Sequence, residues 1–370
     1  MEFIDLKSQQ QKIRNSLIER ISKILDDGQY ILGSEVLDLE NELSKFSGSK
    51  HTITCANGTD ALMLAMLALG IGPGDKVITV PFTYIATLEA IAAIGATPVL
   101  IDVYDETFNM NPESIEEIIK KSENKIKAIM PVDLFGLPAR YRLINEIAKK
   151  YNIPVIGDAA QSFGASKGNT KVGTFAEITT TSFFPAKPLG CYGDGGAIFT
   201  DSDELRHVLE SLRVHGKGVD KYDNIRIGMN SRLDTIQAGI LLEKLKIFKK
   251  EIISRNSIAE KYRQLLKNLP LRFQHIPDNY ESVYAQFSII FNDNQTRNRI
   301  QKALSEKKIP SVVYYGIPGH LQTGYKYLNY KSGDFPVSES LSKTILSLPM
   351  HPYLNDSQIE LICTAINEEF

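Results

Sequence analysis

The sequence predicts an α/β fold, in which a mixed, mostly parallel sheet covered by helices forms a large domain and a smaller α+β domain follows. Over the first two thirds of the chain, short apolar runs alternate with helix-length segments. Those runs lack polar alternation, which is typical of strands buried on both faces. The 370 residues are also about twice the length of an ordinary domain. We therefore expect a large domain with an N-terminal segment over 1–245 and a small C-terminal domain over 246–370.

The expected elements of the large domain alternate along the chain. Strands are expected at 52–55, 77–80, 98–101, 127–132, 154–157 and 196–200. Helices are expected at 58–70, 84–94, 112–121, 138–151 and 203–214. Because a strand that returns through a helix lies parallel to its predecessor, this order predicts a mostly parallel sheet.

The rest of the chain has a different pattern. Long amphipathic helices are expected over 231–269, starting at Ser231 and ending near Pro270. Apolar, β-branched stretches at 285–291 and 311–315 flank a helix at 294–307, and a helix at 356–369 closes the chain. These elements predict a separate, smaller α+β unit.

Composition and charge exclude several classes of function. The chain has 42 basic and 44 acidic residues, so its net charge gives no general attraction to nucleic acid or to an anionic membrane. The lysine-rich run 244–250 has apolar residues at helical spacing and is interpreted as a solvated helix face. The three cysteines do not have the spacing of a metal site, so no metal is expected. The chain also has no basic leader segment and no apolar run long enough to span a membrane, so a cytoplasmic protein is expected.

Three segments of the large domain carry residues suited to chemistry. The first, 57–62, follows a strand and opens an apolar helix, where free N–H groups, Gly58 and the Thr59 hydroxyl would form a phosphate cradle. A plain helix cap is the other interpretation. The second contains Asp158, which ends a buried strand at the sheet edge where ligands bind in open α/β folds. An N-cap for the following segment is its alternative.

The third segment places Lys187 among apolar residues, glycines and prolines. Burial there would lower the pKa of the amine and make it available as a nucleophile and base. A buried lysine paired to a structural carboxylate is the alternative. Taken together, a phosphate cradle, a strand-end aspartate and this lysine are what pyridoxal 5′-phosphate requires: the lysine binds the aldehyde, and the aspartate keeps the ring nitrogen protonated.

These motifs resemble those of the DegT/DnrJ/EryC1/StrS sugar aminotransferases, which belong to the fold-type I, aspartate aminotransferase-like enzymes of pyridoxal phosphate. The resemblance covers nearly the whole chain, and the segments that carry it most clearly are 28–33, 56–61, 158–162, 182–187 and 346–352.

The resemblance implies roles for individual residues. Lys187 would bind the cofactor aldehyde, Asp158 the pyridine nitrogen and Gln161 the phenolic oxygen. Ser182 would hold the phosphate with Gly58 and Thr59. Tyr84 would stack on the cofactor ring, with Phe82 as a rival for that role. Asn230 would reach the phosphate from a second subunit, which implies a homodimer with shared active sites.

The resemblance also implies the reaction. Relatives that dehydrate sugars carry histidine in place of Lys187, so the lysine favours amino transfer. L-glutamate would convert the cofactor to pyridoxamine 5′-phosphate, and a keto-sugar nucleotide would then accept the amine. Neither a nucleic acid nor a membrane is an expected partner.

The overall pattern is most similar to the branch that aminates C3 of UDP-linked 2-acetamido-3-keto sugars, including the hexuluronic acid, for surface polysaccharide, lipopolysaccharide or O-antigen synthesis. Arg232 from the second subunit suits a sugar carboxylate, and an interface bridge is its alternative. Tyr314 stands where that branch has histidine. Together with Tyr315 and His320 it is expected to line the sugar site, although His320 in a surface loop is equally compatible with the sequence.

Other activities stay open at this point. A dTDP-linked 3-keto-6-deoxyhexose or a 4-keto sugar nucleotide could be the acceptor. A sugar dehydratase or a non-catalytic regulator could also be built on the same fold.

Overall fold

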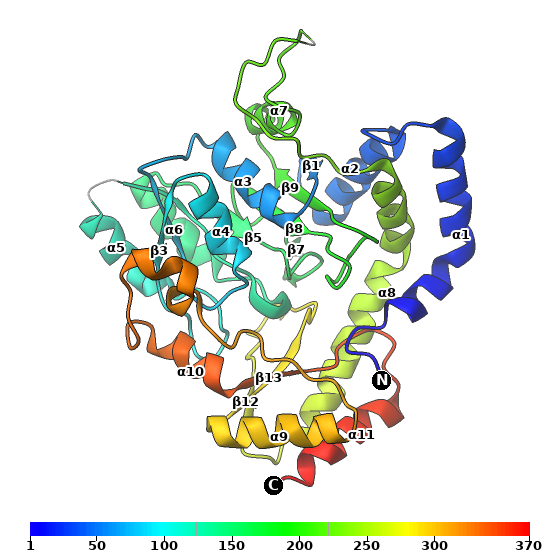
Figure 1. Cartoon of the computed structure of the whole chain (residues 1–370), viewed down its shortest axis with the longest axis vertical. Helices are drawn as coiled ribbons and strands as arrows, with labels where there is room; N and C mark the ends of the chain where they lie inside the picture. The colour runs from blue at the N-terminus through cyan, green and yellow to red at the C-terminus, as the bar shows by residue number, and fades with distance from the viewer. Residues whose placement is uncertain (123–124, 221) are drawn as a thin grey trace.

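A large sheet forms the centre of the molecule (Figure 1). The computed structural model describes residues 1–122, 125–220 and 222–370. Parallel bridges Ile129–Val155 and Val132–Asp158 join two sets of strands into the order β3-β2-β4-β5-β8-β9-β1. Strand β9 is antiparallel to both neighbours, and the other pairs are parallel. The strands are β1 (His51–Cys55), β2 (Lys76–Thr79), β3 (Thr97–Leu100), β4 (Ile126–Ile129), β5 (Ile156–Asp158), β8 (Ile178–Ser182) and β9 (Gly196–Thr200).

The expected strands of this sheet are all present, and one strand was not expected. The strand at 196–200 keeps its bounds, and the others shift by a few residues. Strand β8 is missing from the sequence-based prediction because its Ile-Thr-Thr-Thr-Ser run is not apolar, although these threonines are buried. Threonine is β-branched and pairs well in sheets, so β-propensity rather than hydrophobicity would have indicated this strand.

Helices cover both faces of the sheet, as predicted for parallel strands. Successive residues of a strand point to opposite faces. Ile78 of β2 therefore packs with α5 and α6, while its neighbour Val77 packs with α3, α4 and α7. The helices are α3 (Gly58–Ala68), α4 (Ala86–Ala93), α5 (Ile115–Lys121), α6 (Tyr141–Tyr151) and α7 (Asp203–Leu212).

The small domain is built on the antiparallel sheet β10-β12-β13. Its core lies between this sheet, the C-terminal half of α8 and helices α9 and α11. The expected strand at 311–315 is wrong: Val312 forms a single bridge to Ser347, and β12 pairs with β10 and β13. The bounds are β10 (Leu271–Phe273), β12 (Phe287–Phe291), α9 (Asn294–Glu306), α10 (Pro336–Thr344), β13 (Ile345–Leu348) and α11 (Asp356–Asn367).

Helix α8 (Thr235–Leu266) runs from the large domain to the small one without a break, so the domain boundary expected near residue 245 lies inside it (Figure 1). Helices α1 (Leu6–Asp27) and α2 (Ser34–Ser47) lie against it. A small sheet, β6 (Ser166–Lys167), β7 (Thr170–Lys171) and β11 (Tyr280–Glu281), links the two domains.

The interpretation of residues 244–250 as a solvated helix face is wrong at its first residue. Lys244 is 0% exposed, while the lysines at 246, 249 and 250 are exposed. Helical periodicity places residues on a face, but the face that α8 buries here is set by α2 and by the segment near Gly190 that pack on it. In the described part of the chain, no helix has the length and apolar character needed to cross a membrane.

Candidate active site

The carboxyl ends of β5 and β8 place two predicted site residues side by side. Asp158 ends β5, Ser182 ends β8, and the two strands are parallel, with Asp158 opposite Thr180. The carboxyl ends of parallel strands meet at one edge of a sheet. Asp158 and Ser182 therefore face the same space, into which α3 also begins.

Asp158 is a buried and firmly oriented carboxylate. It is 4% exposed, Thr87 Oγ1 donates to its Oδ2 at 2.7 Å, and the Ala160 N–H donates to its Oδ1 at 3.2 Å. Burial raises the pKa of Asp158, and the positive charge of Lys187 opposes that shift. Each oxygen keeps a free lone pair, so the carboxylate can accept a further hydrogen bond from a cationic N–H.

Lys187 is presented by a closed loop. The Cys191 N–H donates to Phe183 O and the Lys187 N–H to Phe184 O, both at 2.8 Å. A Cβ at Gly190 would lie 2.6 Å from the carbonyl oxygens of Phe184 and Pro185, so only glycine closes this loop. Burial lowers the pKa of Lys187, and Asp158 opposes the shift, so the two charges interact. A larger fraction of the amine is then neutral and nucleophilic.

The start of α3 packs directly on Ser182. Asn57 caps the helix by accepting from the Asp60 N–H at 2.8 Å. A Cβ at Gly58 would lie 2.6 Å from Ser182 Cβ, so glycine is needed for this approach. The first N–H groups of a helix lack intrahelical acceptors. The helix-cap interpretation of this segment is therefore confirmed, and the phosphate cradle stays a prediction that is compatible with it, because the cap leaves the N–H groups of Gly58 and Thr59 available to an anion.

The orientation of Gln161 is fixed by its neighbours. The Phe135 N–H donates to its Oε1 at 2.8 Å, so the amide nitrogen must point the other way, where it donates to Tyr315 Oη at 3.1 Å. Phe135 holds a positive φ of 59° to make this contact. One hydrogen of the amide is left for a further acceptor.

The two aromatic candidates lie in different environments. Phe82 is fully buried in the core, whereas Tyr84 is 55% exposed, with its ring centroid 6.2 Å from that of Tyr315. Tyr84 can therefore cover a ligand. Phe82 instead packs edge-on against the Tyr315 ring, with 6.3 Å between the ring centroids.

Four other predicted residues make no hydrogen bond, ion pair or ring contact with Asp158 or Lys187 within the described part of the single chain. Asn230 is exposed and Arg232 is half-buried, and both follow the arm formed by residues 214–220 and 222–229, which projects beyond α7 (Figure 1). Tyr314 packs edge-on against Phe3. His320 lies neither on the surface nor open to a ligand: it is 2% exposed, and its Nε2 is 3.1 Å from Glu339 Oε1.

Sequence reasoning missed Thr87 and Phe135. Thr83 and Thr87 lie four residues apart and their hydroxyl groups are hydrogen-bonded at 3.0 Å. Thr83 lies just before α4 and Thr87 in its first turn, and two threonines four residues apart at the start of a mostly apolar segment are a signal in the sequence. Phe135 acts through its backbone, so no side-chain pattern indicates it.

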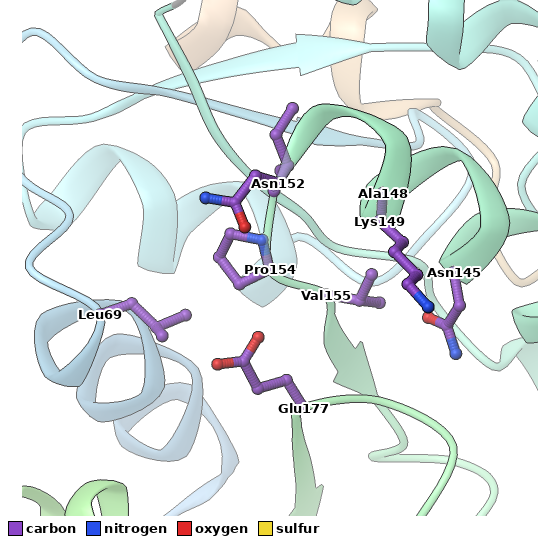
Figure 2. Close-up of a pocket in the computed structure, with 9 residues that line it drawn as sticks. Leu69, Asn145, Ala148, Lys149, Asn152, Pro154, Val155 and Glu177 are labelled. Atoms are coloured by element: carbon purple, nitrogen blue, oxygen red, sulfur yellow. The ribbon is translucent and has the colours of Figure 1, made fainter.

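A separate cavity of about 520 Å³ opens at the amino ends of the same two strands (Figure 2). Leu69, Asn152 and Pro154 line it, and the carboxylate of Glu177, which precedes β8, points into it. None of the residues predicted for the site lies there.

The comparisons with known proteins give a consistent result. The model of the DegT/DnrJ/EryC1/StrS aminotransferase family matches residues 11–367. A UDP-2-acetamido-2-deoxy-3-oxo-D-glucuronate aminotransferase from Pseudomonas aeruginosa is 46% identical over 99% of both chains. A UDP-N-acetyl-3-dehydro-α-D-glucosamine 3-aminotransferase from Acidithiobacillus ferrooxidans is 41% identical over 98% of this chain and 96% of that protein.

Solved structures agree with the fold. An aminotransferase of this family from Brucella abortus superposes with a TM-score of 0.95 at 47% identity, over 100% of this chain and 99% of that one. NtdA of Bacillus subtilis, solved with its bound cofactor PMP, superposes with a TM-score of 0.90 at 29% identity, over 99% of this chain and 83% of that one.

Proposed function

Because the chain belongs to the DegT/DnrJ/EryC1/StrS aminotransferase family, we propose that it transfers the amino group of L-glutamate to a 3-keto, nucleotide-linked sugar with pyridoxal phosphate as cofactor. The fold is that of the fold-type I aminotransferases. The observation that carries the proposal is the meeting of three segments at one sheet edge. Asp158 and Ser182 end the parallel strands β5 and β8, the closed loop of Lys187 follows Ser182 directly, and Gly58 packs on Ser182.

The residues at this sheet edge fit pyridoxal phosphate. The glycine at position 58 leaves an approach that a Cβ would fill, next to N–H groups and the Ser182 hydroxyl, which suits a phosphate. The oriented carboxylate of Asp158 suits the pyridine N–H, and the free amide hydrogen of Gln161 suits the phenolic oxygen. Tyr84 would cover the ring. When bound, the group supplies an electron sink that stabilises negative charge at the carbon that loses its proton.

Lys187 and Asp158 have separate duties in the proposed reaction. Lys187 would hold the cofactor by its Nζ between turnovers. Its lowered pKa would let the free Nζ take a proton from the substrate carbon and return it on the cofactor side. Asp158, kept in place by Thr87, would hold the proton on the ring nitrogen.

The acceptor that the two curated relatives favour is a UDP-linked 2-acetamido-3-keto sugar, since both act on such substrates. One of them acts on a uronate and the other on a glucosamine derivative. Arg232 would bind a sugar carboxylate. Tyr314, half-buried against Phe3, offers a hydroxyl and no positive charge. Surface polysaccharide, including lipopolysaccharide O-antigen, is the proposed destination of the product, with synthesis in the cytoplasm.

The active unit in this proposal is a homodimer. Val219, Ile225 and Ile227 on the projecting arm are exposed by 57% or more, and Tyr30 and Ile31 add further exposed apolar surface beside the start of α8. Exposed apolar surface of this kind marks an interface. A second copy would cover it and bring Asn230 and Arg232 to the site of its partner.

The dimer is tested by placing a charge on the arm. Ile227→Asp is expected to give monomers in size-exclusion chromatography with light scattering, and to lose transfer activity. Ile253→Asp, at a 67% exposed position on α8, is the matched control and should remain dimeric. A monomeric wild-type protein with full activity would refute the shared site.

The activity itself is tested with purified protein and pyridoxal phosphate. We expect a visible absorption band that bleaches when glutamate is added. A panel of 3-keto and 4-keto sugar nucleotides, with and without a C6 carboxylate, then identifies the acceptor by the product mass. A product that has lost oxygen without gaining an amine would indicate dehydration, and bound cofactor without any turnover would indicate a regulator.

A further inference from the structure

A fully buried lysine lies beneath the loop that carries Lys187. Lys244 of α8 is 0% exposed, and its Nζ donates to the Gly190 carbonyl oxygen at 2.5 Å. The same nitrogen lies 4.2 Å from the centre of the Tyr192 ring, a cation–π distance. The Lys244 ammonium therefore contacts Gly190 inside the closed loop of Lys187 and Tyr192 just after it.

Burying this ammonium is costly for the fold. Desolvation lowers the pKa of Lys244 to about 8, and the charge of Glu251 only partly offsets it. Glu251 is itself buried and accepts from Gln9 Nε2 at 3.0 Å and from the Tyr353 hydroxyl. A methionine of similar volume would avoid the desolvation cost. The hydrogen bond to Gly190 is what distinguishes the lysine from such a residue.

The Gly190 carbonyl is a sensitive point of the loop. Gly190 is closely surrounded: a Cβ added there would lie 2.6 Å from the carbonyl oxygens of Phe184 and Pro185. Its neighbour Cys191 closes the loop through its N–H to Phe183 O. A shift of this peptide would be passed to Lys187, because a tightly packed loop moves as a unit.

We propose that Lys244 is a positioning residue, whose Nζ fixes the Gly190 carbonyl and thereby holds the closed loop in the geometry that directs Lys187 toward Asp158. This inference rests on the proposed function only in what Lys187 does, and its structural part can be tested without cofactor.

The first test is amide hydrogen exchange in the full-length protein without cofactor. In Lys244→Met we expect the amides of Lys187 and Cys191 to exchange about tenfold faster or more, with the amides of β12 and β13 unchanged. Lys250→Met, at an exposed position of the same helix, is the matched control and should leave both regions unchanged. Equal acceleration in both regions, or none in the loop, would overturn the proposal.

A second variant separates the hydrogen bond from the charge and guards against a misfolded methionine variant. Lys244→Gln keeps an N–H donor, one bond shorter and uncharged. Its loop amides should exchange at rates between those of the wild type and of Lys244→Met. Exchange in the loop as slow as in the wild type would show that the lysine is not needed there.

The functional part is tested by the rate at which pyridoxal phosphate is captured, followed through its visible absorption. Lys244→Met should slow capture by about 10- to 100-fold, because a displaced amine attacks from a poorer geometry. A wild-type protein that develops no band refutes the proposed function but leaves the exchange result valid. A wild type and a Lys244→Met variant that capture the cofactor equally fast refute this inference and leave the proposed function intact.

Discussion

The two ends of strands β5 and β8 carry the same kinds of groups in very different arrangements. At the carboxyl ends, Asp158 is buried and receives two hydrogen bonds, from Thr87 and Ala160. At the amino ends, Glu177 is exposed beside a cavity of about 520 Å³, and partial desolvation is the only cause that raises its pKa (Figure 2). Each end also has a lysine, Lys187 at the first and Lys149 at the second.

The comparison shows that an open volume is not what makes a chemical site here. The cavity at the amino ends is roomy, but the Glu177 carboxylate in it is exposed to solvent. At the carboxyl ends, backbone and side-chain groups orient Asp158 and Gln161 before a ligand arrives, and such preorganisation lowers a reaction barrier. The parallel direction of β5 and β8 explains the asymmetry, because residues after a parallel strand are free to turn over the sheet edge.

The largest expected difference between the two ends lies in the lysines. Lys187→Ala should abolish the visible band formed with pyridoxal phosphate and lower the transfer rate by at least about a thousandfold. Lys149→Ala should leave both unchanged. Absorption spectra and product mass spectrometry measure the two effects. A Lys187→Ala variant that still forms the band would contradict the role proposed for Lys187.

A smaller difference is expected between the carboxylates. Asp158→Asn keeps the shape but removes the negative charge, and should lower the transfer rate by about 100- to 1000-fold. Glu177→Gln should not change the rate. Steady-state kinetics with glutamate and the best acceptor compare the two, and equal rates for Asp158→Asn and the wild type would contradict the assigned role.

The glycines test the cradle. An added Cβ at Gly58 would lie 2.6 Å from Ser182 Cβ, so Gly58→Ala should cost about 1–3 kcal/mol in unfolding free energy and weaken cofactor binding. At Gly72 an added Cβ would have nothing within 4 Å, so Gly72→Ala is the matched control. Denaturant unfolding and cofactor titration measure both effects, and unweakened cofactor binding in Gly58→Ala would argue against a phosphate at this position.

The smallest effect concerns pH. Asp133 is fully buried beside β5, accepts from the Ala139 N–H and the Ser162 hydroxyl, and burial raises its pKa from 3.8 to about 7. The folded state therefore binds more protons than the unfolded state between these values, and this residue should make the unfolding free energy fall as the pH rises through that window.

Asp133→Asn should remove that decline, because the amide keeps an oxygen for the Ala139 N–H, and the Ser162 hydroxyl can turn to accept. Glu177→Gln at the other end should change the pH profile far less, since Glu177 is exposed. Urea unfolding at several pH values gives the comparison. Parallel profiles for the wild type and Asp133→Asn would show that Asp133 is ionised throughout the window.

The sequence was sufficient for the fold class and for the family. The resemblance is confirmed by the family match over residues 11–367, and the alternation of apolar runs with helices gave the parallel part of the sheet. Asp158 and Lys187 could be singled out because burying a charge in an apolar segment costs free energy unless the charge has a partner or a function. The signals at Asp158 and Lys187 are local, because each lies within one short run of consecutive residues.

Other features depended on partners far away in the chain. Only the tertiary structure places β8 between β5 and β9, turns Lys244 toward Gly190 instead of solvent, and buries His320 against Glu339. The contact of Gln161 with Tyr315 joins residues 154 positions apart. Periodicity tells which residues share a face of a helix or strand, but what packs on that face, and which polar groups must then find partners there, is decided by the folded chain as a whole.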